Sequence, residues 1–130
     1  MEKGALEVVK AFYDAAESGR VAELPRLRAP DVCWIEMEGS IYGGTYRGPD
    51  AVVSRVFTRL ATEWLDYAFH LDRLRDARDS VVASGHYTGT YVKTGKPMRC
   101  RSLHVWDIRD GQIIRFEQFC DTLVMSRALS

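Results

Sequence analysis

Residues 102–121 read SLHVWDIRDGQIIRFEQFCD, two runs rich in β-branched and aromatic residues on either side of Asp110-Gly111. An Asp-Gly pair between alternating runs is a strong hairpin signal, because both central residues of the tight turn need positive φ. The pattern predicts strands over 98–109 and 112–120, and a short tail after them.

The preceding segments also have strand patterns. Residues 66–74 alternate, residues 80–92 are rich in Val, Tyr and Thr, and Thr94-Gly95 is typical of a turn. Consecutive strands joined by tight turns pair antiparallel. The second half of the chain is therefore predicted to form one antiparallel sheet.

The N-terminal half predicts three helices, over 2–18, 21–28 and 49–64. The second is expected to be short or distorted by Pro25. In the third, inward side chains recur at helical spacing: Val53, Val56, Phe57, Leu60, Ala61 and Trp64. Two segments separate the second and third predicted helices. They are a strand over 31–37 and a loop-like segment over 39–48, which contains a short extended piece at 45–47. We expect an α+β fold in which three helices cover one face of a strongly curved sheet.

Composition excludes several classes of function. The 130 residues include 18 basic and 18 acidic side chains, which argues against nucleic acid and anionic membranes as partners. No apolar run suits a signal peptide or a membrane span. Three cysteines, without metal-type spacing, favour a reduced, cytoplasmic protein. We expect one domain over 1–130, with no metal and no cofactor.

Strand alternation gathers aromatic and isolated polar side chains on the covered face. This predicts a small, mostly apolar pocket for a small hydrophobic molecule. Its expected lining is Tyr13, Trp34, Glu36, Tyr87, Tyr91, Ser102, His104, Trp106, Phe116 and Gln118. Gly85 and Gly89 either open space there or permit sheet curvature.

The other sheet face mixes charges with apolar side chains: Leu103, Val105, Ile113 and Phe119. A partly apolar outer face favours a homodimer.

Five segments in this order resemble the nuclear-transport-factor-2-like superfamily, in its SnoaL-like and ketosteroid-isomerase-like branch: FYDAAESGRVAEL, APDVCWIE, YRGPDAV, TGKP and the C-terminal hairpin. The resemblance runs from Phe12 to Asp121. It implies a cone-shaped, cystatin-like roll with a mixed sheet, and frequent homodimers. It fixes no activity, because this fold carries isomerases, cyclases, dehydratases, epoxide hydrolases and binders.

The resemblance implies that Glu36 matches the general base of ketosteroid isomerases and His104 matches their acidic hydrogen-bond donor. A carboxylate beside Trp34 in an apolar pocket should have a raised pKa. Phe12 stands where those enzymes have a catalytic tyrosine. Tyr13, Tyr87 and Tyr91 are the candidates for a replacement donor.

Departures from the family patterns count against a strict steroid-isomerase mechanism, through Phe12, and against the epoxide-hydrolase activity. Gly85, Tyr87 and Gln118 replace the Arg and the two Asp of the epoxide-hydrolase branch. The resemblance to the polyketide-cyclase branch implies a carboxylate near Gln118; Asp121 is close in sequence but is expected to face the other way or to lie past the strand end. We expect a cofactor-independent isomerase, cyclase or dehydratase in which Glu36 and His104 move a proton on a hydrophobic carbonyl-bearing or polycyclic substrate. The alternative is a non-catalytic module that binds an apolar ligand or dimerises.

Overall fold

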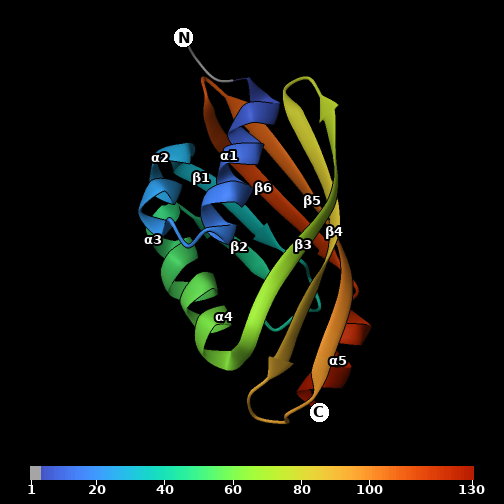
Figure 1. Cartoon of the computed structure of the whole chain (residues 1–130). Helices are drawn as coiled ribbons and strands as arrows, with labels where there is room; N and C mark the ends of the chain where they lie inside the picture. Colours follow the sequence, from blue (N-terminus) through green and yellow to red (C-terminus); the bar gives the residue numbers. More distant parts are fainter. Residues whose placement is uncertain (1–3) are drawn as a thin grey trace.

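Six strands form one curved sheet in the order β2-β1-β6-β5-β4-β3 (Figure 1). The computed structural model describes residues 4–130. The strands are β1 (Arg28–Glu36), β2 (Gly44–Arg47), β3 (Trp64–Ala77), β4 (Ser80–Tyr91), β5 (Pro97–Arg109) and β6 (Gln112–Cys120). Only β1 and β6 pair parallel; the other neighbours pair antiparallel. The expected α+β class and mixed sheet are confirmed.

Helices from the N-terminal half cover the concave face of the sheet (Figure 1). They are α1 (Ala5–Glu17), α2 (Leu24–Leu27), α3 (Pro49–Val52) and α4 (Thr58–Glu63). Residues 2 and 3 of the first predicted helix lie outside the described residues. The segment 21–28 is distorted as expected. A 3-10 turn over Val21–Glu23 precedes α2, which places Pro25 in the first turn of α2, where its missing N–H costs nothing.

The predicted helix over 49–64 forms with a π-helical turn, Val53–Phe57, between α3 and α4. The expectation that Val53 and Ala61 face inward is wrong. Val52 and Val56 occupy the core, and Val53 is 43% exposed. Adjacent helical residues differ by about 100° in direction, so a core position at Val52 turns Val53 outward.

The predicted tail is instead a helix, α5 (Thr122–Leu129). Asp121 caps it by accepting a hydrogen bond from the Val124 N–H at 3.1 Å. Met125 and Ala128 are buried in a cluster with side chains of three strands. The helix therefore covers the end of the sheet that the N-terminal helices leave open.

A bulge in β6 reverses one predicted orientation. Asp107 pairs with Arg115 but Ile108 pairs with Ile113, so Ile114 is the extra residue. Ile113 is consequently fully buried instead of lying on the outer face.

Gly85 permits the close approach of β3 and β4. A Cβ atom at Gly85 would lie 2.2 Å from the His70 carbonyl oxygen, whereas the nearest atom to a Cβ at Gly89 is 3.4 Å away. The interpretation that Gly85 opens space in the pocket is therefore wrong, because β3 occupies the place of its missing side chain.

Candidate functional site

Inward side chains from α1 and four strands meet at the centre of the concave face. Glu36, His104 and Gln118 are 5%, 2% and 4% exposed. His104 and Gln118 are paired residues of β5 and β6, and Trp34 on β1 is paired with Phe116 on β6. The parallel pairing of β1 with β6 thus brings the first and last strands together at this point.

Glu36 is held by two donors. The Trp34 indole N–H donates to Oε2 at 2.9 Å, and the Gln118 Nε2–H donates to Oε1 at 3.1 Å. Burial raises the pKa of Glu36 to about 7, although the Trp34 hydrogen bond favours the charged form. The rise expected from the sequence is confirmed.

His104 lies between two tyrosine hydroxyls. The Tyr13 hydroxyl is 2.5 Å from Nδ1 and the Tyr87 hydroxyl is 2.7 Å from Nε2. Burial lowers the pKa of His104 to about 3, so the imidazole is neutral near pH 7.

The neighbours of His104 decide its tautomer. The Trp106 indole, which can only donate, gives its N–H to the Tyr13 oxygen at 2.9 Å. Tyr87 donates to Gln118 Oε1 at 2.5 Å, so it must accept from His104 Nε2–H. Nδ1 therefore accepts the Tyr13 hydroxyl proton.

The result is one hydrogen-bond chain in which every proton points the same way. It runs through Trp106, Tyr13, His104, Tyr87, Gln118 and Glu36. The carboxylate is the final acceptor of this chain. A change in the charge of Glu36 therefore changes the polarisation of each hydrogen bond along it.

Aromatic rings enclose this chain. The Phe116 ring lies 4.0 Å from Trp34 and 4.9 Å from His104, centroid to centroid. Phe69 of β3 lies 4.3 Å from His104. None of three hollows on the surface of residues 4–130 is lined by Glu36 or His104. The polar residues expected to line an open pocket instead contact one another directly.

Two predicted lining residues lie away from the chain. The Tyr91 ring packs against Trp64 at 5.0 Å. The Ser102 hydroxyl donates to the Cys100 carbonyl oxygen at 3.4 Å.

The sequence interpretation did not identify Phe69 or Tyr67. Tyr67 stacks on Tyr87 at 5.1 Å. Burial, together with the charge of Glu36, raises the pKa of Tyr67. Alternation of 66–74 was the available signal, since it places both rings on the inward face.

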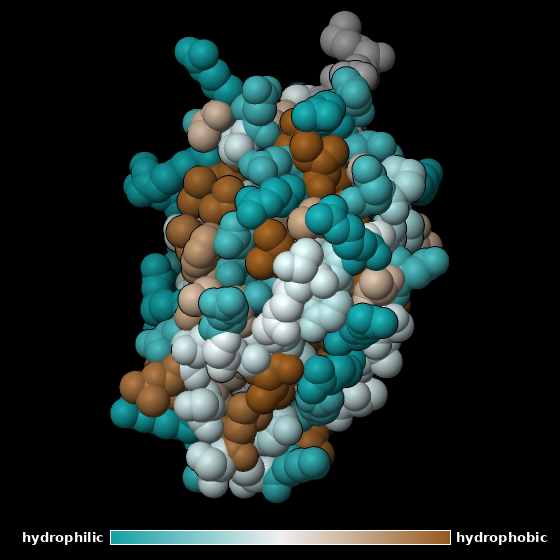
Figure 2. All heavy atoms as spheres, turned by 180° about the vertical axis from the view of Figure 1, so that it is seen from behind, coloured by the Kyte–Doolittle hydropathy of each residue, from teal (hydrophilic) through white to brown (hydrophobic). Residues whose placement is uncertain are grey.

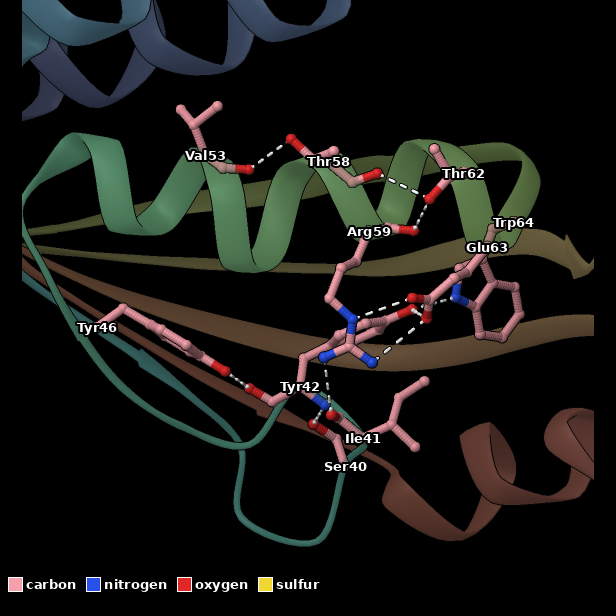
Figure 3. A network of polar contacts seen from close by, with 10 residues as sticks. All are labelled: Ser40, Ile41, Tyr42, Tyr46, Val53, Thr58, Arg59, Thr62, Glu63 and Trp64. Atoms are coloured by element: carbon pink, nitrogen blue, oxygen red, sulfur yellow. Dashed lines mark hydrogen bonds and ion pairs between the residues drawn. The ribbon is translucent and has the colours of Figure 1, made fainter.

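A second polar network closes the end of the site near α4 (Figure 3). Tyr42 donates to Glu63 at 2.9 Å and accepts from the Trp64 indole N–H at 2.8 Å. The Arg59 guanidinium lies 4.6 Å from the Tyr42 ring centroid and also pairs with Glu63. These contacts fix the loop that follows Glu36 against α4.

No group of three His, Cys, Asp or Glu side chains within 4–130 is placed to hold a metal ion. In the same range, no helix has both the length and the apolar character needed to cross a membrane.

A curved mixed sheet with helices on its concave face is the architecture of the NTF2-like proteins that this chain resembles. Residues 9–116 match the SnoaL-like domain family, and the chain belongs to that family. No curated protein matches the sequence.

Solved structures agree with the assignment. An NTF2-like protein from Burkholderia thailandensis E264 is 42% identical, with a TM-score of 0.96 over 98% of each chain. TerC, co-crystallized with polyporic acid, is 23% identical (TM-score 0.85; 96% of this chain, 97% of that one). A Catenulispora acidiphila protein with a ketosteroid isomerase-like fold, in complex with trimethylamine, is 18% identical (TM-score 0.76; 94% and 92%). The last two show the fold alone.

Proposed function

We propose that the protein is a cofactor-independent enzyme in which Glu36 abstracts a proton next to a carbonyl of a hydrophobic substrate. The observation that carries this proposal is the burial of the Glu36 carboxylate on the covered face, which raises its pKa to about 7. A general base works best when its pKa lies near the operating pH. Isomerisation, cyclisation and dehydration all begin with this proton transfer.

The hydrogen-bond chain supplies the other half of the chemistry. Tyr87, which accepts from His104 at 2.7 Å, can turn its own proton from Gln118 to a developing enolate oxygen. Tyr87 thereby replaces the hydroxyl that Phe12 lacks. Neutral His104 acts as a positioning residue that orients Tyr87.

Glu36 is only 5% exposed, so a substrate reaches it only after neighbouring side chains move, and we propose that they move at the end of the cone near α5. The side chains there are mostly aromatic or flexible: Tyr42, Trp64, Tyr67, Tyr91, Met98 and Met125. Methionine and ring rotations allow such a cluster to admit an apolar molecule. TerC, a fold neighbour, was crystallized with an organic small molecule, which is consistent with this type of ligand.

The test is deuterium exchange at the acidic carbon of β-tetralone, a bicyclic ketone, followed by NMR. This readout detects the shared proton-transfer step whatever the natural product is. We expect catalysed exchange by the native protein and its loss in Glu36→Gln. The matched control is Glu38→Gln, an exposed carboxylate two residues further on. Exchange that is equally fast in Glu36→Gln would overturn the assignment of the base.

A further inference from the structure

Arg28 is a buried cation that the proposed chemistry does not use. It begins β1, and its side chain shares the covered face with Trp34 and Glu36. Arg28 is 1% exposed, and its Nε and Nη1 atoms have no hydrogen-bond partner among the described residues. No carboxylate between residues 4 and 130 forms an ion pair with it.

Three aromatic rings surround this guanidinium. Its central carbon lies 5.9 Å from the Phe12 ring centroid, 5.7 Å from Trp34 and 5.5 Å from Phe57. Ring faces attract a cation, but they do not replace the acceptors that its N–H groups lose on burial. An arginine cannot escape this penalty by losing its proton, because the guanidinium stays protonated in proteins.

We propose that Arg28 binds the carboxylate of an aromatic organic acid. A carboxylate supplies the missing charge and acceptor oxygens together, and the rings of Phe12, Trp34 and Phe57, which pack around the guanidinium, favour an aromatic body for the ligand once they move apart. A single buried guanidinium neutralises a monoanion. It leaves part of the charge of a phosphate unpaired, which favours the carboxylate.

The location of Arg28 also specifies the substrate class of the proposed enzyme, and this step rests on the proposed function. Trp34 contacts both charged groups: its ring faces Arg28, and its indole N–H donates to Glu36 at 2.9 Å. A substrate that reaches both groups spans the indole. It carries its carboxylate at one end and its reactive carbonyl at the other.

The test compares binding of β-naphthoate with that of its neutral amide by isothermal titration calorimetry. We expect the native protein to prefer the carboxylate by roughly 10- to 100-fold, the value of hydrogen bonds to a charged group. Arg28→Met should lose that preference and still bind the amide. Arg26→Met removes an exposed arginine on the neighbouring helix and should keep the preference.

Arg28→Lys is a second variant that keeps the test decisive if Arg28→Met misfolds, since lysine retains the charge but lacks the planar guanidinium. We expect a preference between those of the native protein and Arg28→Met. An equal affinity of the native protein for both probes, or no binding of either, overturns the proposal. A preference that survives in Arg28→Met also overturns it.

Glu36→Gln separates this proposal from the proposed function. It should abolish deuterium exchange and leave the preference for naphthoate unchanged. If the native protein prefers naphthoate but catalyses no exchange, the Arg28 site is supported and the proposed enzyme activity is overturned. If the native protein catalyses exchange but shows no preference for the carboxylate, the proposed enzyme activity is supported and the Arg28 site is overturned.

Discussion

The Nδ1 atom of His104 accepts the Tyr13 hydroxyl proton over 2.5 Å, although 91 residues separate the two in the chain. This contact places the ring proton on Nε2, where it points to Tyr87. His104 therefore has no free nitrogen for a substrate. In the proposed reaction, the effect of His104 passes through Tyr87.

Tyr13→Phe should destabilise the fold by about 2 kcal/mol or more, because it leaves two buried groups without a partner. These are the Trp106 indole N–H and His104 Nδ1. Urea unfolding measures the effect. Tyr91→Phe is the control, since the Tyr91 hydroxyl has no hydrogen bond to residues 4–130 and should change stability by less than about 0.5 kcal/mol. Equal losses in both variants would contradict the hydrogen-bond chain.

The charge of Glu36 should oppose folding above neutral pH. Its pKa rises from 4.5 to about 7 on folding, so the folded state binds more protons between these values. The stability conferred by the protonated carboxyl is complete below pH 4.5 and is lost as pH rises through about 7. The unfolding free energy of the native protein minus that of Glu36→Gln should fall across this window. A flat difference curve would show that Glu36 titrates normally.

His104 should have the opposite effect at lower pH. Its pKa falls from 6.5 to about 3 on folding, so stability is complete above 6.5 and is lost as pH falls toward 3. NMR of the ring nitrogens checks this directly, because it reports both the charge and the tautomer. We expect a neutral ring with the proton on Nε2 at pH 5. At this pH the effects of Glu36 and His104 on the pH dependence of stability have opposite signs. An imidazolium at that pH would refute the assignment.

Gly85→Ala should cost about 1–3 kcal/mol or more, because the added methyl meets the His70 carbonyl oxygen at 2.2 Å. The obstacle is backbone of the paired strand, which moves only if β3 separates from β4. Gly89→Ala is the matched control on the same strand, with ordinary contacts from 3.4 Å. Thermal unfolding of the two variants measures the difference. Equal melting temperatures would mean that β3 yields readily.

We propose a homodimer through the outer sheet face. That face, seen from behind in Figure 2, carries separate hydrophobic patches among charged side chains. Leu103 and Phe119, paired across β5 and β6, are 36% and 40% exposed. Phe119→Lys should shift the protein toward the monomer in analytical ultracentrifugation. Leu123→Lys, at a 57% exposed position on α5, should not. A native protein that sediments as a monomer rules the dimer out.

Local signals predicted most of the sheet. The bounds of β6 agree with the prediction residue for residue, and Asp110 and Gly111 have φ of 52° and 73°, as the hairpin signal requires. Ile113 and α5 could not be predicted in the same way. A bulge depends on how two strands pair, and a helix of 8 residues gains its stability from packing.

The site was predictable to the level of a face but not of contacts. Alternation correctly placed Trp34, Glu36 and His104 on one side of the sheet. It gives no distances, so it could not show that Tyr87 and Gln118 bridge Glu36 to His104. Arg28 was hidden for a similar reason, because an arginine at the end of a short helical segment is normally exposed.

The parallel pairing of β1 with β6 determines how late in synthesis the sheet can be completed. Glu36 and Gln118 are 82 residues apart, so the carboxylate gains its amide donor only after these 82 residues have been made and have left the ribosome. Until then β1 is paired only with β2, and its other edge is open. Such long-range pairing slows folding and leaves an apolar strand edge open to other chains. A nascent chain halted before β6 should therefore aggregate more readily than the chain whose sheet is complete.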